Sequence, residues 1–119
     1  MPKPFENALV TGGGGFLGKA VVKNLIENGI SVTSLSRNRY PQLDSLLVRQ
    51  IQGDICDRET VNQAAAGMDT VFHVAARAGV WGSREDFYQP NVLGTRNLVN
   101  ACVQNKVDRF IYTSSPSVV

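Results

Sequence analysis

Apolar residues recur along the chain with two spacings, one typical of helices and the other of strands. Leu17, Val21 and Leu25 stand four residues apart, which predicts an amphipathic helix that ends at Asn28-Gly29. The segment ISVTSLS (30–36) instead alternates apolar with polar residues and is rich in β-branched ones, which predicts a strand. The same patterns predict further strands near 8–11, 46–54, 69–76 and 109–115, and further helices at 58–67 and about 92–106.

The order of these segments predicts an α/β fold. Strands that alternate with helices at this spacing form βαβ units and a parallel sheet. Right-handed crossovers then give a doubly wound Rossmann sheet with the strand order 3-2-1-4-5. A full sheet of this kind has a sixth strand, whereas the sequence ends after the fifth. We therefore expect residues 1–119 to be the N-terminal portion of a longer protein, without its C-terminal region.

Composition and charge exclude several classes of protein. Hydrophobic residues make up 43% and charged residues 18%, and 12 basic and 10 acidic side chains leave a net charge of +2. We expect no nucleic-acid partner, because no basic cluster stands out. The N-terminus lacks a signal-peptide core and no apolar run is long enough to span a membrane, so we expect a cytoplasmic protein. Cys56 and Cys102 have no metal-ligand spacing and are expected to be small buried thiols, and no metal is expected.

The glycine-rich stretch TGGGGFLG (11–18) joins the first strand to the first helix. Two glycine spacings fit a dinucleotide site: Gly13, Gly15 and Gly18 give GxGxxG, and Gly12 with Gly15 and Gly18 gives GxxGxxG. The free N–H groups and the positive dipole of a helix N-terminus form an anion site there. The first glycine makes the tight turn, Gly15 lets pyrophosphate approach the backbone, and Gly18 lets helix and strand pack closely.

Two other interpretations of this stretch remain open. Residues 13–19 also read as GxxxxGK, most of a nucleoside-triphosphate-binding P-loop, but Ala20 stands where that loop needs Ser or Thr for Mg²⁺. A glycine turn that binds no ligand is the second alternative.

The end of the second predicted strand bears on which dinucleotide is bound. NAD sites place an acidic residue about twenty positions beyond the glycines, yet no carboxylate occurs between Glu27 and Asp44. The strand ends instead in Ser36 and Arg37, and a guanidinium can pair with a 2′-phosphate through two parallel hydrogen bonds. NADP(H) is therefore favoured over NAD(H) as the cofactor. Arg39 is interpreted as a solvated loop cation.

Five segments together resemble an extended short-chain dehydrogenase/reductase. They are TGGGGFLG, GDICD, VFHVAA, NVLGTRNLVNAC and RFIYTSSPSVV, and the resemblance as a whole runs from residue 8 to the C-terminus. The segment HVAARAGVWGSREDFYQPNVLGT is most similar to the 3β-hydroxysteroid dehydrogenase-like branch, and within it to the 2-alkyl-3-oxoalkanoate reductase group. Sugar-nucleotide epimerases and dehydratases share the glycine and NVxGT motifs and are the nearest alternative.

The resemblance implies a set of site residues. Asp54 and Ile55 would bracket the adenine, Ala75 and Ala76 would line its ribose, and Asn91 would stand at the start of the long helix. Thr95, one turn further on, would either support the fourth strand or serve only in helix packing. Around the pyrophosphate, the resemblance implies Thr11, Gly12, Gly15 and Gly18, with the amides of Phe16 and Leu17.

The resemblance also implies a catalytic serine and exposes a gap in the catalytic machinery. Ser115 matches the family's Ser/Thr that polarises the substrate carbonyl, with Ser114 and Ser117 as neighbouring candidates. The family's proton-donating tyrosine is followed four residues later by a lysine. Here Tyr40, Tyr88 and Tyr112 are followed at that spacing by Asp44, Val92 and Pro116, so no YxxxK occurs. We therefore expect the chain alone to be inactive.

Three side chains near the fourth strand carry competing interpretations. His73 lies inside the strand and is expected to be a hydrogen-bonded core residue rather than a base. Arg77 and Trp81 follow it and either face the substrate or pack against a further domain.

Two classes of function follow. The first is the cofactor-binding portion of an oxidoreductase that acts on an apolar 3-oxo or 3-hydroxy small molecule and forms a homodimer in its full-length form. The second is a non-catalytic NAD(P)-binding module.

Overall fold

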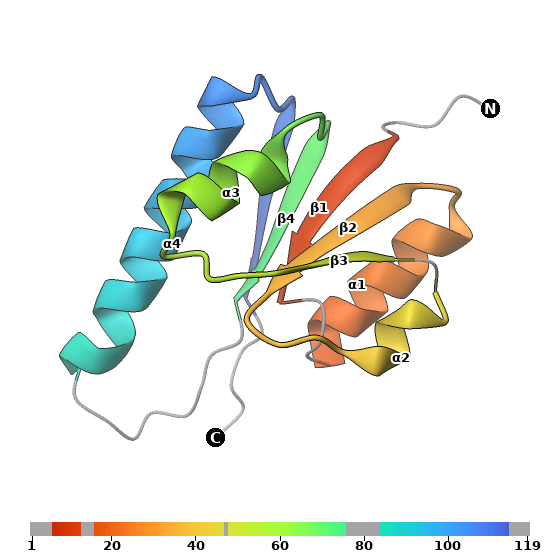
Figure 1. Cartoon of the computed structure of the whole chain (residues 1–119), viewed down its shortest axis with the longest axis horizontal. Coiled ribbons are helices and arrows are strands. Elements are labelled where there is room, and N and C mark those ends of the chain that lie inside the picture. The colour runs from red at the N-terminus through yellow and green to blue at the C-terminus, as the bar shows by residue number, and fades with distance from the viewer. Residues whose placement is uncertain (1–5, 13–15, 47, 76–83, 115–119) are drawn as a thin grey trace.

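The computed structural model describes residues 6–12, 16–46, 48–75 and 84–114 (Figure 1). Five parallel strands form one sheet in the order β3-β2-β1-β4-β5. This order confirms the predicted doubly wound arrangement. The strands are β1 (Asn7–Thr11), β2 (Ser31–Ser36), β3 (Arg49–Gln52), β4 (Thr70–Ala75) and β5 (Arg109–Ser114). The helices are α1 (Phe16–Glu27), α2 (Pro41–Asp44), α3 (Arg58–Ala65) and α4 (Arg84–Gln104).

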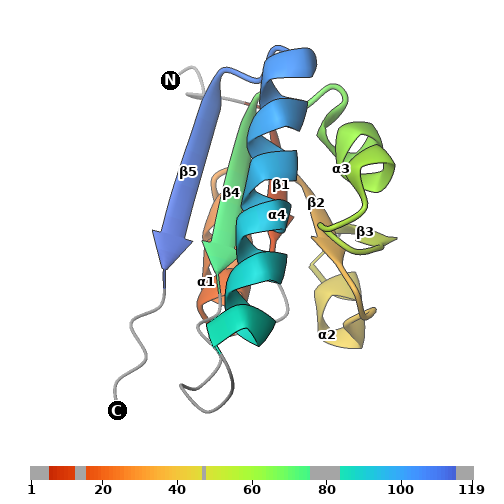
Figure 2. The ribbon, with the colours of Figure 1, turned by 90° about the vertical axis from the view of Figure 1, so that its left-hand side faces the viewer.

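Helices cover both faces of the sheet. In Figures 1 and 2, α1 and α2 lie on one side of the strands and α3 and α4 on the other. Successive strand residues point to opposite faces, so β1 sends Ala8 and Val10 toward α1 and Leu9 toward α4. The result is two buried clusters. The first contains Ala8, Val10, Val22, Leu25, Ile30, Val32, Leu43, Val48 and Val74. The second contains Leu9, Leu35, Val61, Ala64, Ala65, Val71, Leu98, Ala101 and Cys102.

Local signals in the sequence account for several element ends. Helix α1 ends at Glu27 and is followed by Gly29, whose φ of 76° is the left-handed conformation that glycine adopts without a steric penalty. The predicted end of this helix at Asn28-Gly29 is confirmed. Asp57 precedes α3 and accepts hydrogen bonds from the N–H groups of Glu59 and Thr60, which makes it the N-cap of that helix. Hydrogen bonds from the Thr60 hydroxyl and N–H hold the pKa of Asp57 below its ordinary value.

Helix α4 begins earlier than the sequence pattern predicts. It starts at Arg84 rather than near Val92, so Pro90 and Asn91 lie within the helix instead of at its start. The expectation that Asn91 begins the helix is therefore wrong.

Helix α2 was not predicted from the sequence. It is a single turn of four residues with Pro41 at its first position, where the missing N–H costs nothing. Leu43 anchors the turn and is fully buried in the cluster beneath α1. One buried residue in four residues is too short a pattern for periodicity to reveal.

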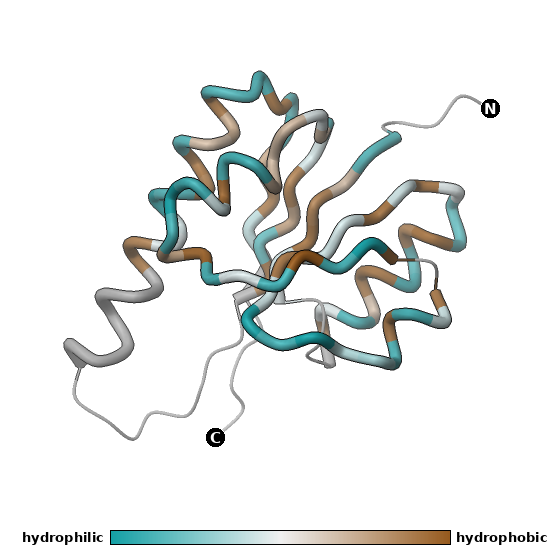
Figure 3. Tube along the Cα trace, viewed as in Figure 1, coloured by the Kyte–Doolittle hydropathy of each residue, from teal (hydrophilic) through white to brown (hydrophobic). Residues whose placement is uncertain are grey.

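Hydrophobic residues gather on the central strands and on the helix faces that meet them (Figure 3). Within the described residues, β5 pairs only with β4 and forms one edge of the sheet. Ile111 and Tyr112 are exposed on this edge strand. None of the helices in the described residues is both long and apolar enough to cross a membrane.

Candidate functional site

The predicted cofactor residues lie at one edge of the sheet. Because all five strands are parallel, their carboxyl ends meet at the same edge, where α/β proteins bind ligands. Thr11 ends β1, Ser36 ends β2 and Ala75 ends β4, while Asp54 and Ile55 are the second and third residues after β3. Phe16, Leu17 and Gly18 form the first turn of α1 at the same edge. Gly15, Ala76 and Ser115 lie outside the described residues, as do Arg77, Trp81 and Ser117.

Gly12 is required by the backbone at the end of β1. Its φ is 75°, a conformation that residues with a Cβ rarely adopt. A Cβ at this position would also run into the carbonyl oxygen of Val74 on the neighbouring strand β4. Gly12 therefore permits both the turn out of β1 and the close contact with β4. Gly18, two residues into α1, is buried, in keeping with its predicted packing role.

His73 of β4 joins three elements, because it is hydrogen-bonded to β1 and to α4. Its Nδ1 atom is hydrogen-bonded to Oγ1 of Thr11 at 2.6 Å, and its Nε2 atom to Oγ1 of Thr95 at 3.2 Å. The side chain is only 4% exposed, and burial lowers the pKa of His73 below its ordinary value of 6.5. The neutral ring donates from one nitrogen and accepts at the other, which suits two hydroxyl partners. The prediction of a hydrogen-bonded core histidine is confirmed, and Thr95 does support β4.

Thr11 therefore enters the site through its backbone. Its side chain is buried and its hydroxyl is already hydrogen-bonded to His73. An expected contact between Thr11 and a pyrophosphate would use its main chain and that of Gly12.

The segment after β2 carries two arginines that differ in their surroundings. Arg39 pairs with Asp44 at 2.8 Å, whereas the guanidinium of Arg37 is exposed and makes no hydrogen bond or ion pair within the part of the chain that the structure describes. The hydroxyl of Ser36 donates to the carbonyl of Asn38 at 2.9 Å, which turns the chain at this point. Of the two arginines, Arg37 is thus the one available to an incoming anion.

Asp54, Ile55 and Cys56 form a turn after β3. Oδ1 of Asp54 accepts from the N–H of Cys56 at 2.9 Å. Burial raises the pKa of the Cys56 thiol, as does the Asp54 carboxylate, while the Arg37 guanidinium lowers it. Arg37 and Asp54 therefore shift the pKa of the same thiol in opposite directions. Cys56 is only half-buried, so the prediction of two buried thiols holds for Cys102 alone.

Two residues of α4 hold this turn in place and were not singled out from the sequence. Asn97 is buried and donates from Nδ2 to the carbonyl of Ile55 at 2.9 Å. Gly94 packs so closely that a Cβ there would collide with the side chain of Ile55. The signal for Asn97 was an asparagine among apolar helix positions, where it is unfavourable unless its side chain has a partner.

These features fit a dinucleotide. The glycine turn leads directly into the N-terminus of the twelve-residue helix α1, which supplies free N–H groups and a positive dipole for phosphate. The exposed Arg37 and the Asp54–Ile55 turn stand at the neighbouring strand ends, on the side where a ribose and a base would follow. In the described segments, no three His, Cys, Asp or Glu side chains are grouped so as to hold a metal ion.

Comparison with known proteins agrees with this arrangement. The chain is 51% identical over 113 residues to the 2-alkyl-3-oxoalkanoate reductase of Shewanella oneidensis, covering 95% of this chain and 29% of that protein. It is 49% identical over 110 residues to the enzyme of the same name from Stenotrophomonas maltophilia, covering 92% of this chain and 33% of that protein. The chain thus spans about a third of the length of these relatives.

A solved structure shows the same fold. MoeE5, determined in complex with UDP-glucose and NAD, superposes with a TM-score of 0.79 at 36% identity and covers 94% of this chain and 37% of that one. The model of the 3-beta hydroxysteroid dehydrogenase/isomerase family matches residues 9–119. The resemblance drawn from the sequence motifs is confirmed: the chain belongs to the 3-beta hydroxysteroid dehydrogenase/isomerase family.

Proposed function

We propose that this chain is the NADP(H)-binding portion of an oxidoreductase that acts on an apolar 3-oxo or 3-hydroxy compound. The observation that carries the choice of cofactor is the exposed Arg37 guanidinium at the carboxyl end of β2. A 2′-phosphate can accept two charge-assisted hydrogen bonds from such a group. Asp44, the first carboxylate along the chain after Glu27, is already paired with Arg39.

The remaining cofactor contacts follow from the strand ends. Gly12, Gly15 and Gly18, with the amides of Phe16 and Leu17, would hold the pyrophosphate. Asp54 and Ile55 would hold the adenine, and Ala75 and Ala76 would border its ribose. The complex of MoeE5 with NAD supports a nicotinamide dinucleotide as the class of ligand. The alternative, NAD(H), predicts that Arg37 has no effect on affinity.

The chemistry of the site is hydride exchange at a carbonyl or hydroxyl carbon, which a nicotinamide ring supplies when bound. Ser115 would hold the substrate carbonyl by a hydrogen bond and stabilise the negative charge that develops on its oxygen. The sequence contains no tyrosine followed four residues later by lysine, so residues 1–119 hold no matched proton donor of that kind. Losing such an acid typically lowers the rate by ~10²–10⁴-fold. We therefore propose that residues 1–119 alone do not catalyse the reaction.

The substrate class rests on the relatives. Two proteins that are 51% and 49% identical to this chain are 2-alkyl-3-oxoalkanoate reductases, and the family is named for 3-beta hydroxysteroids. Both classes present a 3-oxo or 3-hydroxy carbon next to an extended apolar group. MoeE5 was solved with a nucleotide sugar, which keeps an epimerase or dehydratase as the second candidate.

The position of the protein in the cell and its assembly are further parts of the proposal. We expect a cytoplasmic protein. We also expect that it binds no nucleic acid, since the net charge is only +2. We also expect a homodimer in the complete protein. Its support is the outer surface of α4, where Leu93, Val99 and Val103 are exposed, the last of them 75%.

An NADPH-oxidation assay separates these functions. The protein in its complete native form is mixed with NADPH and a 2-alkyl-3-oxo acid, a 3-ketosteroid or a nucleotide-sugar ketone, and the loss of NADPH absorbance is followed. Oxidation with either of the first two supports the proposal. Turnover of the nucleotide sugar alone would favour the second candidate, and NADPH binding without any turnover would indicate a non-catalytic module.

A further inference from the structure

Strand β3 holds the segment that carries Arg37 at three successive points. The N–H of Gly53, just after the strand, donates to the carbonyl of Ser36 at 2.8 Å. The side chain of Gln52 donates from Nε2 to the carbonyl of Arg37 itself at 3.2 Å. The side chain of Gln50 forms two hydrogen bonds with the backbone of Tyr40. Its Oε1 accepts from the Tyr40 N–H at 2.8 Å, and its Nε2 donates to the Tyr40 carbonyl at 3.0 Å.

The two glutamines act from one face of the sheet. Gln50 and Gln52 are two residues apart in β3, and alternate strand residues point to the same face. They pair in register with Ser34 and Ser36 of β2. Their side chains form hydrogen bonds with the backbone of Tyr40 and Arg37, beyond the end of β2. A side-chain amide that both accepts from and donates to one residue's backbone imitates the pairing of another strand. The 36–40 segment is therefore held against β3 by backbone and side-chain hydrogen bonds.

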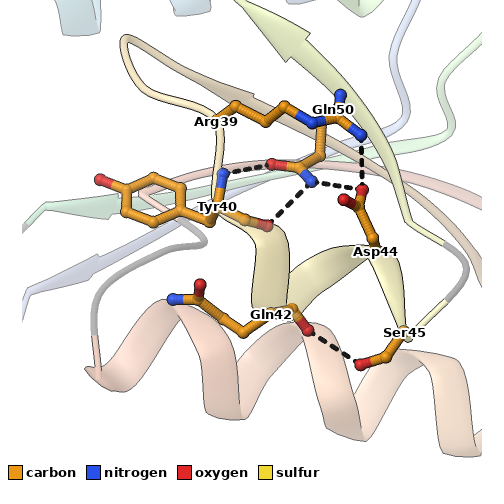
Figure 4. Close-up of polar contacts among 6 residues, drawn as sticks. All are labelled: Arg39, Tyr40, Gln42, Asp44, Ser45 and Gln50. Atoms are coloured by element: carbon orange, nitrogen blue, oxygen red, sulfur yellow. Dashed lines mark hydrogen bonds and ion pairs between the residues drawn. The ribbon is translucent and has the colours of Figure 1, made fainter.

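The same set of contacts pairs the Arg39 guanidinium with a carboxylate, so that it is not free to bind an anion. Nε2 of Gln50 also donates to Oδ1 of Asp44 at 2.9 Å, and that oxygen accepts from Arg39 at 2.8 Å (Figure 4). Arg39 is thus held against α2 by a carboxylate that Gln50 helps to orient. Arg37 is left as the cation of this segment that faces no carboxylate partner in the described residues.

We propose that Gln50 and Gln52 are positioning residues that set the preference for NADP(H), by fixing the backbone from which Arg37 reaches a 2′-phosphate. This inference rests on the proposed function, because it takes Arg37 as the phosphate ligand. In this proposal the two glutamines act through the backbone of the segment and not by contact with the cofactor. A flexible 36–40 segment would still carry the guanidinium. It would lose conformational entropy when the phosphate binds, and this loss would weaken the affinity.

The test is the ratio of NADPH to NADH affinity in Gln50→Met/Gln52→Met. Methionine keeps the length of each side chain and removes the hydrogen bonds. The control is Gln42→Met on α2, since only the carbonyl of Gln42, and not its side chain, is hydrogen-bonded in the described structure (Figure 4). Both cofactors are titrated by calorimetry into the protein in its complete native form, with thermal unfolding measured in parallel.

We expect the double variant to bind NADPH about three- to ten-fold more weakly, the range for one net hydrogen bond, with NADH affinity changed by less than about two-fold and the control unchanged. A loss that affects both cofactors equally would show a structural role only and overturn the inference. If the double variant does not fold, Gln52→Met decides, because the Gln52 side chain is exposed and its one hydrogen bond within the described residues is to the carbonyl of Arg37. An unchanged ratio there overturns the inference. A wild-type protein without a preference for NADPH would instead overturn the proposed cofactor, and this inference with it.

Discussion

Nδ1 of His73 lies 2.6 Å from Oγ1 of Thr11, so the core of β4 is tied to the last residue of β1 before the glycine turn. The other ring nitrogen reaches Thr95 on α4. One buried ring therefore sets the relative positions of three elements that meet at the proposed cofactor site. Its effect on the pH dependence of stability is measurable because His73 is the single histidine of the chain.

The stability of the fold should fall as the pH drops below the ordinary pKa of histidine, 6.5. Burial lowers the pKa of His73 in the folded chain, so below that pH the unfolded chain binds a proton that the folded chain does not. The stabilisation is complete above 6.5 and is lost as the pH falls toward the lower, folded pKa. Denaturant unfolding at a series of pH values measures the slope of the unfolding free energy against pH. His73→Gln should abolish the dependence just below 6.5; a slope that is the same in the variant would show that His73 does not cause it.

Gly12→Ala should destabilise the protein more than Gly67→Ala. Both glycines have a positive φ, 75° and 78°, so both variants meet the left-handed penalty of about 1–2 kcal/mol. A Cβ at position 67 contacts nothing within 4 Å, whereas one at position 12 strikes the Val74 carbonyl. That collision should add about 1–3 kcal/mol to the loss in unfolding free energy. Equal losses of unfolding free energy in the two variants would mean that β4 shifts to accommodate the Cβ without a measurable loss of stability.

Asn97→Ala should weaken both the fold and the adenine side of the site. The substitution leaves the Ile55 carbonyl without its 2.9 Å donor, which should cost about 1–3 kcal/mol. NADPH and NADH affinities should fall together, because both cofactors carry adenine. Asn100→Ala on the exposed side of the same helix is the control and should change stability by less than about 0.5 kcal/mol. If Asn100→Ala matched Asn97→Ala, the contact with Ile55 would not be the cause.

Arg37→Ala should weaken NADPH binding and leave NADH binding nearly unchanged. A charge-assisted contact of this kind is worth about 1.5–3 kcal/mol, or roughly 10- to 150-fold in affinity. Arg39→Ala is the matched control, because that guanidinium is already paired with Asp44. Equal weakening of both cofactors by Arg37→Ala, or an effect of Arg39→Ala as large as that of Arg37→Ala, would contradict the assignment.

The sheet could be predicted from the sequence because its strands carry their own signals. Apolar periodicity predicted the order of the elements, and the right-handedness of the crossover connections then left one topology. The residues at the ends of β1, β2 and β3 followed from that topology. Contacts between distant segments could not be found in this way. The bond from Asn97 to Ile55 spans 42 residues, and the Gln50 contacts depend on a one-turn helix that periodicity does not reveal. The start of α4 was also missed, because Pro90, a residue that disfavours a helix interior, lies within the helix.

Calorimetric titration of NADPH into wild-type protein and Gly15→Val, each in its complete native form, tests the central claim most directly. A valine at position 15 would place a branched side chain where pyrophosphate must approach the backbone. The account predicts that the wild-type protein binds NADPH and that Gly15→Val, though folded, shows no measurable binding. Unchanged NADPH affinity in a folded Gly15→Val variant would contradict the assignment of the glycine turn as the dinucleotide site.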